Sequence, residues 1–159
     1  MTHKNLIILI FFIFLGHCGY SAVYNDNSNL NIKITLLNMI GDREFNNKID
    51  SKLRRFYNKE TGKEFKINLS TNISKEIVSK DATGKIIDYI LLATATFKIS
   101  YNDINETFTF KESLNIKNID DTFEQRKYED AIKDNFASSI NNKLILKLKE
   151  IKWSKKYFK

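Results

Sequence analysis

The chain has 159 residues, of which 42% are hydrophobic and 13% aromatic, and its formal net charge is +7. This length fits one domain with a sizeable core, and the apolar and aromatic content excludes a disordered tail. Proline is absent and glycine occurs five times, which excludes collagen-like and proline-rich linker sequences.

The histidines and the cysteine are confined to the N-terminal segment, where they stand as His3, His17 and Cys18. If the chain is cut before Cys18, the exported protein has no histidine, and its one cysteine is the first residue. Ser-His-Asp and Cys-His catalysis then lack a base, and His/Cys metal sites lack ligands. One cysteine also excludes a disulfide within the chain.

Residues 1–17 have the features of a lipoprotein signal peptide. Residues 6–15 form an unbroken apolar run, and ten helical residues reach about 15 Å, half the thickness of a bilayer core. The run ends in Leu15-Gly16-His17-Cys18, which is similar to a bacterial lipobox. The sequence therefore predicts cleavage before Cys18 and a covalent lipid on that residue, with no other cofactor. An uncleaved anchor and an ordinary signal peptide are the alternatives.

Residues 18–29 are predicted to form a polar, lipidated tether. Ser21 and Ala22 follow the cysteine with no aspartate directly after it, a pattern typical of lipoproteins sorted to the outer membrane. Several acyl chains on one residue anchor a protein stably, whereas a single chain does so only marginally.

The first half of the domain reads as strand, helix, strand. Alternation over residues 30–38 predicts a strand, and Asp42 is a candidate N-cap for the helix after it. The stripe of that helix runs to about residue 59, with Gly62 as its expected stop, and consists of Phe45, Ile49, Leu53 and Phe56. Residues 65–74 then alternate, with Phe65, Ile67, Leu69, Thr71 and Ile73 on one face and polar residues on the other, which predicts a strand that continues to about residue 78.

The second half reads as two strands and a helix. A turn at residues 80–85 leads to a long strand at 86–101, and a tight turn at 102–103 leads back through 106–116. Asp120 or Asp121 opens a helix with apolar spacing to Leu148. The order β-α-β-β-β-α predicts an α+β fold with two helices on one face of a four-stranded, mostly antiparallel sheet. Residues 30–148 form this single domain, and residues 149–159 form a basic aromatic tail.

Several of these segments together resemble the lipopolysaccharide-assembly lipoprotein family LptE. The start Cys18-Gly19-Tyr20 is similar to the Cys-Gly-aromatic start of that family. The turn with Gly84 shortly before Asp88-Tyr89 and a long alternating strand looks like its second hairpin. Residues 124–148, an acidic opening followed by a helical apolar register, look like its C-terminal helix.

The resemblance implies a fold of two helices against a four-stranded sheet, and a role without catalysis. A protein of this family is anchored by its lipid in the outer membrane and faces the periplasm and the lumen of the β-barrel LptD, which it plugs. There it supports barrel folding and helps to pass lipopolysaccharide to the cell surface. The family binds lipopolysaccharide through basic residues at the tip of its second hairpin, and the basic residues at that place here are Lys80 and Lys85.

Charge points to the tip and to the tail as alternative contacts for an anionic, amphipathic partner. Residues 143–159 hold seven lysines and one acid, and the tail also carries Trp153, Tyr157 and Phe158. Phosphorylated lipid A fits both places, because lysine is a competent phosphate partner. Nucleic acid also fits the charge but is not expected as a partner of an exported protein. For the tail and for the tip, ordinary solvated lysines are the competing interpretation.

Two other functions compete with this interpretation. The first is a periplasmic lipoprotein adaptor of another envelope exporter. The second is a small periplasmic hydrolase that uses carboxylates, for which the acid pairs Asp120-Asp121 and Glu129-Asp130 are the candidates. Both pairs fall in or just before a predicted surface helix, which disfavours the hydrolase.

Overall fold

The computed structural model describes residues 31–59 and 62–154, with side chains up to Ile151. The predicted signal peptide at 1–17, Cys18 and the tether at 18–29 lie outside the described residues, as do residues 155–159. The described residues belong to one compact unit, which begins at Asn31.

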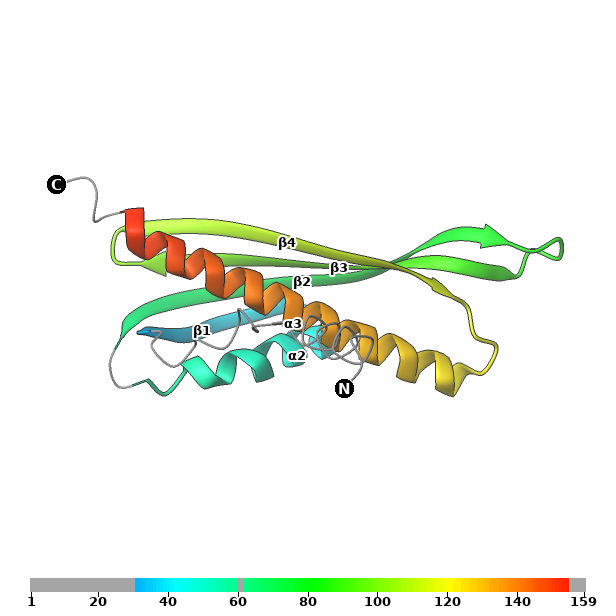
Figure 1. The fold of residues 1–159 in the computed structure, drawn as a ribbon, viewed down its shortest axis with the longest axis horizontal. Coiled ribbons are helices and arrows are strands. Elements are labelled where there is room, and N and C mark those ends of the chain that lie inside the picture. Colours follow the sequence, from blue (N-terminus) through cyan, green and yellow to red (C-terminus); the bar gives the residue numbers. More distant parts are fainter. Residues whose placement is uncertain (1–30, 60–61, 155–159) are drawn as a thin grey trace, which may run out of the picture. The chain divides into compact units, whose positions relative to one another are not determined.

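The described chain folds in the predicted order β-α-β-β-β-α (Figure 1). The elements are β1 (Ile32–Gly41), α2 (Arg43–Leu53), β2 (Lys63–Lys80), β3 (Ile86–Tyr101), β4 (Ile104–Lys117) and α3 (Thr122–Ser154). The strands form one sheet in the order β1-β2-β3-β4. β1 is parallel to β2, and the other two pairs are antiparallel. The parallel pair follows from the crossover through α2, because parallel strands cannot be joined by a tight turn.

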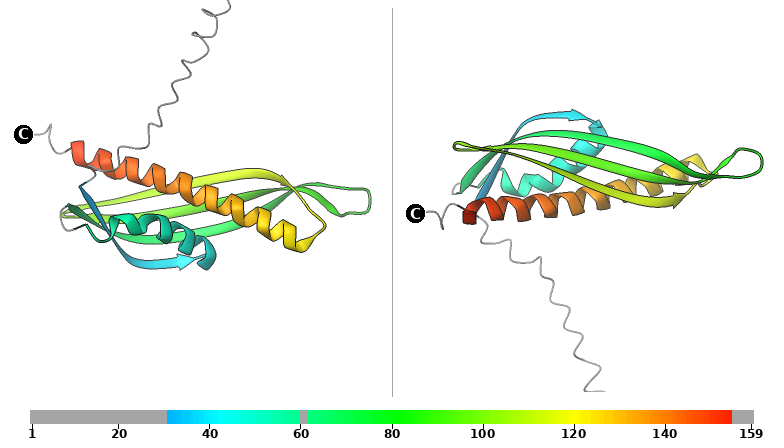
Figure 2. Two further views of the ribbon diagram at one scale, coloured as in Figure 1. Left: turned by 60° about the horizontal axis from the view of Figure 1, so that its bottom comes forward. Right: turned by 90° about the horizontal axis from the view of Figure 1, so that it is seen from above.

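Both helices cover the same face of the sheet, as predicted (Figure 2). Alternate side chains of β2 and β3 point into the layer between sheet and helices, which is why the sequence of these strands alternates. The core contains Phe65, Ile67 and Leu69 of β2, Leu91, Ala93, Ala95, Phe97 and Ile99 of β3, Phe45, Ile49 and Leu53 of α2, and Ile140, Leu144 and Leu148 of α3.

Ion pairs and one buried amide join the two helices. The three pairs are Lys48–Asp130 at 2.6 Å, Lys52–Asp134 at 2.8 Å and Lys133–Glu44 at 2.9 Å. Asn141 donates from Nδ2 to the carbonyl oxygen of Ile49 at 3.1 Å, and its side chain is buried. These contacts fix α2 against the middle of α3.

Two helix ends differ from the predicted positions. α2 ends at Leu53, and a 3-10 turn over Arg54–Phe56 takes its place, so the helix stops short of residue 59. The turn is closed by the bond from Tyr57 N to Arg54 O at 3.1 Å and leaves the Phe56 side chain buried. α3 continues to Ser154, so the first residues of the predicted tail are helical.

The junction between β1 and α2 depends on Gly41. Its φ is +98°, and a Cβ built on it would lie 1.8 Å from the carbonyl oxygen of Thr71. The next residue, Asp42, donates its amide to that same oxygen at 3.3 Å. As predicted, Asp42 also caps α2, because its Oδ1 accepts from the amide of Phe45 at 2.8 Å.

β2 is much longer than its parallel neighbour. β1 pairs with β2 only up to the pair Gly41–Thr71, whereas the pairing of β2 with β3 continues to Lys80 and Ile86. From Asn72 onward, the outer edge of β2 therefore has no strand beside it in the described part of the chain. This half of the β2–β3 hairpin extends to the end of the domain where α3 begins (Figure 1).

Candidate functional site

The turn that joins β2 to β3 forms the hairpin tip, residues 80–85, where the sequence placed its candidate lipopolysaccharide contacts. The carboxylate of Asp81 organises the turn: its Oδ1 accepts from Thr83 N at 2.8 Å, Thr83 Oγ1 at 2.6 Å and Lys85 N at 2.9 Å. The hydrogen bond from the Thr83 hydroxyl is the main reason that the pKa of Asp81 lies below its usual value. Gly84 completes the turn with a φ of +84°.

Lys80 and Lys85 stand at opposite ends of this turn, and both are exposed. Lys85 forms an ion pair with Asp120, 2.5 Å from Nζ to Oδ1. Within the part of the chain that the structure describes, Lys80 has no acidic partner. The structure thus places both residues where the sequence predicted them, but only Lys80 carries a charge without a counter-ion.

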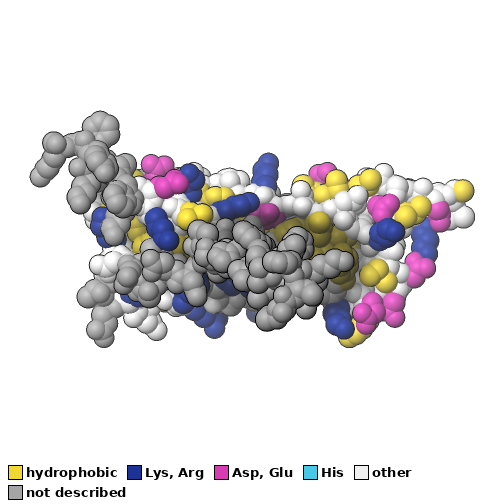
Figure 3. All heavy atoms as spheres, in the orientation of Figure 1, with side chains coloured by type: hydrophobic (Ala, Val, Ile, Leu, Met, Phe, Trp, Pro, Cys, Tyr) yellow, Lys and Arg dark blue, Asp and Glu magenta, His cyan; other side chains and the backbone are white. Residues whose placement is uncertain are grey.

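Acidic side chains lie at the same end of the domain as these two lysines, so this end is not a strongly positive surface. Asp81, Asp88, Asp120 and Asp121 all belong to this end of the domain, and Figure 3 shows acidic and basic groups interspersed there. Sequence reasoning missed Asp120 as the partner of Lys85. Topology supplies the signal: β4 runs antiparallel to β3, so the segment after β4 must return to the start of β3, beside the tip.

A polar cluster of three buried side chains and one exposed lysine fastens the start of α3 to the hairpin. The Oε1 of Glu129 accepts from Lys75 Nζ at 2.6 Å, from Gln125 Nε2 at 2.9 Å and from the Tyr89 hydroxyl. Gln125 also accepts from the amide of Ile119 at 2.7 Å. Since β2, β3, α3 and the segment before α3 all contribute, the cluster holds these elements in one arrangement. We call these four side chains, Lys75, Tyr89, Gln125 and Glu129, the polar latch.

The polar latch keeps Glu129 ionised although its side chain is buried. Burial by itself raises the pKa of the carboxyl, but the hydrogen bonds from Lys75, Tyr89 and Gln125 outweigh it, and the pKa falls below its usual value. For Tyr89 the effects add, because burial and the hydrogen bond to Glu129 both raise the pKa of the phenol.

The acid pairs considered for a hydrolase have structural partners. Asp121 caps α3, since its Oδ1 accepts from the amides of Phe123 at 2.8 Å and Glu124 at 3.1 Å. Asp130 is bound to Lys48, whose hydrogen bond lowers the pKa of that carboxyl. Across residues 31–59 and 62–154, no group of three histidine, cysteine, aspartate or glutamate side chains is arranged to hold a metal ion.

Two lysines at the start of the C-terminal basic region are also paired. Lys143 bonds to Glu112 at 2.6 Å and Lys147 to Glu150 at 2.6 Å. The tail beyond Ser154 lies outside the described residues, and so does the candidate lipidation site Cys18. Among the helices that are described, none is long and apolar enough to cross a membrane.

Comparison with known proteins gives the fold a precedent. No protein-family model and no curated protein matches the sequence. The solved structure of the rare lipoprotein B from Shewanella oneidensis matches with a TM-score of 0.55 at 12% identity, over 74% of this chain and 99% of that chain. The class that the structure defines is therefore an α+β domain with the fold of this lipoprotein.

Two further solved structures match with lower TM-scores. A minor lipoprotein from Acinetobacter baumannii gives a TM-score of 0.47 at 15% identity, over 69% of this chain and 91% of that chain. A lipoprotein B from Nitrosomonas europaea gives a TM-score of 0.49 at 10% identity, over 70% of this chain and 81% of that chain.

Proposed function

We propose that this protein is a non-catalytic outer-membrane lipoprotein that acts like LptE, plugging an LptD-like β-barrel and assisting lipopolysaccharide assembly at the cell surface. The observation that carries the proposal is the fold shared with the rare lipoprotein B over 99% of that chain. The lipobox-like site at Leu15–Cys18 stands in front of this fold and supports the same assignment. The exported chain after cleavage would have no histidine, which supports a binding role.

The hairpin tip is the first candidate contact for the lipid A phosphates. Lys80 offers an exposed charge without a counter-ion among the described residues. Lys85 is held by Asp120, but side-chain exposures of 54% and 74% make this a surface ion pair. Such pairs contribute only about 0–1 kcal/mol, so a phosphate can take the place of Asp120 at little cost. In this proposal both lysines meet phosphate as point charges.

The experiment that tests the function is crosslinking in the outer membrane of the native organism, followed by identification of the partner. Full-length protein with a photo-crosslinking residue at Leu146, an exposed position on α3, should capture a large outer-membrane β-barrel. A matched protein with the same residue at the buried position Ala95 of β3 measures background. Recovery of a subunit of another exporter in place of the barrel would favour the periplasmic adaptor.

A further inference from the structure

The sheet has a second face that no described helix covers. Side chains of strands alternate between the two faces, so the residues between the buried ones of β2 and β3 point away from α2 and α3. In the half of the sheet next to the β3–β4 turn, the pairing aligns them in rows across three strands. The rows are Lys66–Ser100–Asn105, Asn68–Lys98–Thr107, Ser70–Thr96–Thr109 and Asn72–Thr94–Lys111. We call these twelve residues the open-face patch.

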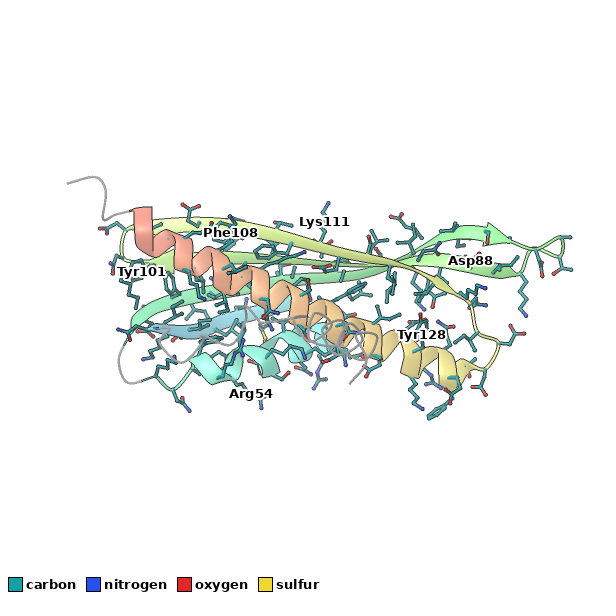
Figure 4. The ribbon with its side chains drawn as sticks, in the orientation of Figure 1. Arg54, Asp88, Tyr101, Phe108, Lys111 and Tyr128 are labelled. Atoms are coloured by element: carbon teal, nitrogen blue, oxygen red, sulfur yellow. The ribbon has the colours of Figure 1, made fainter. Side chains whose placement is uncertain are left out.

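The open-face patch carries positive charge and no acid. It contains three lysines, and every other member is serine, threonine or asparagine. Lys66, Lys98 and Lys111 are all exposed. In the described ranges none of them forms an ion pair, although the charge of Lys66 contributes to the lowered pKa of Glu64. Figure 4 shows Lys111 pointing away from the helices. This differs from the hairpin tip and from the helix layer, where acids lie beside or pair with the lysines.

A cleft opens at the end of the patch that contains Lys66. It has a volume of about 580 Å³ and is lined by Gly62, Lys63, Glu64, Lys66, Ser100, Tyr101 and Asn102. Lys63 Nζ lies 5.6 Å from the centre of the Tyr101 ring. The one acid, Glu64, already has partners: the Thr35 hydroxyl at 2.6 Å, whose hydrogen bond leads the lowering of its pKa, and Lys33 at 3.7 Å. The cleft therefore presents Lys63 and Lys66 beside a carboxylate that is already bonded to Thr35 and Lys33.

We propose that the open-face patch and its cleft bind the phosphorylated saccharide headgroup of lipopolysaccharide. Lys66, Lys98 and Lys111 meet the phosphates, and the hydroxyl and amide side chains between them meet the sugar hydroxyls. This inference rests on the proposed function and assigns that function a second contact, separate from the hairpin tip.

Three features of the patch favour this ligand. Phosphate suits lysine, which acts as a point charge. None of the twelve side chains is a large hydrophobe, so the patch fits the polar headgroup and not the acyl chains. The cleft has the volume of a small-molecule site, which favours a projecting sugar phosphate over the wall of a protein partner. The patch also lies far from the tip, because Thr94 and Ile86 are roughly 25 Å apart at about 3.3 Å per residue.

The test uses full-length protein with Lys66→Glu, Lys98→Glu and Lys111→Glu combined. Binding is measured to purified lipopolysaccharide, to its deacylated phosphorylated oligosaccharide, and to the same oligosaccharide after phosphatase treatment. The triple variant should bind the first two at least tenfold more weakly than wild type. The matched triple Lys→Arg variant, which keeps the charges, should stay within about threefold. Neither protein should bind the phosphatase-treated oligosaccharide strongly.

The outcomes separate the inference from the function on which it rests. If wild type binds lipopolysaccharide and the triple glutamate variant binds lipopolysaccharide and the phosphorylated oligosaccharide as tightly as wild type does, the open-face site is wrong and the proposed function stands. If wild type binds no lipopolysaccharide, the proposed function and this inference both fail. If the variant keeps saccharide binding but no longer captures its barrel partner, the patch is a protein contact. Single Lys98→Glu replaces the triple variant should the latter fail to fold.

Discussion

At the scale of single residues, Gly41 is the described glycine at which an added Cβ would meet the closest contact. The close approach of the Thr71 carbonyl and the positive φ act together there, at the point where β1 gives way to α2. An added methyl group would collide with backbone, which cannot rotate away as a side chain can.

We therefore expect Gly41→Ala to lower the free energy of unfolding by more than about 2 kcal/mol, because strain and a backbone clash coincide. Gly84→Ala is the matched control. Gly84 also has a positive φ, of +84°, but nothing lies within 4 Å of its added Cβ. The Gly84→Ala variant should lose only about 1–2 kcal/mol of its free energy of unfolding. Urea unfolding of both proteins measures the difference, and equal losses would contradict the role of the clash.

Glu129 makes the polar latch sensitive to pH. Its pKa is lowered in the folded state, so its contribution to stability is present above the pKa of the unfolded chain, about 4.3. That contribution is lost as pH falls through the still lower folded value. Burial opposes the shift, and the hydrogen bonds from Lys75, Tyr89 and Gln125 cause it.

Glu129→Gln should destabilise the protein at pH 7 by about 1–3 kcal/mol, because a hydrogen-bonded charge is removed from a buried site. The difference in free energy of unfolding between variant and wild type should narrow as pH falls below about 4.3. It should be lost once pH passes the lower folded pKa, because folded wild type then also loses the charge. Thermal unfolding across pH 3–7 measures it. Glu124→Gln, at an exposed position in the first turn of α3, controls for the loss of one acid. A stability difference between Glu129→Gln and wild type that stays constant with pH would contradict a role for the ionised Glu129 in stability.

At the scale of elements, the β2–β3 hairpin has two parts: paired strands that are fastened to α3, which we call the stem, and a charged turn at the end. The polar latch holds the stem against α3, whereas the hairpin tip is exposed and held by its own Asp81. Substitutions in the tip therefore leave the core intact, and a change in binding there can be read separately from a change in stability.

Lys80→Glu with Lys85→Glu should weaken lipopolysaccharide binding by about tenfold or more, since each charge-assisted contact contributes about 1.5–3 kcal/mol. Thermal stability should change little, because both side chains are exposed. The loss should shrink in high salt, where exposed charges are screened. A chain truncated after Leu148 is the comparison. If the double variant binds like wild type and the truncated chain does not, the C-terminal basic tail makes the contact.

The elements could be predicted more fully than the contacts between them. Alternation over residues 65–74 and 93–101 identified β2 and β3, because one face of these strands is buried. The ion pair of Lys85 with Asp120 could not be found in this way, since the two residues meet only after β4 has returned along β3. The end of α3 was also missed: the apolar spacing was followed only to Leu148, although Ile151 lies three residues further on and no proline or glycine comes after Leu148 to end the helix.

At the scale of the whole molecule, the proposed lipoprotein would combine a membrane anchor with a domain that has two candidate sites for an anionic ligand. The anchor depends on Cys18, which follows the apolar run and Leu15-Gly16-His17. Several acyl chains on that residue would hold the domain at the membrane surface. The open-face patch and the hairpin tip would then act on ligand that is already concentrated there.

Metabolic labelling with a radioactive fatty acid should label the wild-type protein and leave Cys18→Ser unlabelled. The physical reason is that the thiol is the only site in the chain at which a lipobox-directed thioether can form. Membrane fractionation of the same cells should show the variant released from the outer membrane or retained as an uncleaved precursor. Equal labelling of the two proteins would end the lipoprotein assignment.

The unequal lengths of β1 and β2 have a consequence for hydrogen exchange. Past Thr71, β2 is bonded on one side only, and along an edge strand successive amides point alternately toward the neighbouring strand and toward solvent. Amide protons of residues 72–77, where the pairing with β3 is regular, should therefore exchange in an alternating pattern, slow where they bond to β3 and fast in between. The fast amides mark an unpaired edge that another chain could join, and the charges of Lys75, Glu76 and Lys80 along it oppose such pairing.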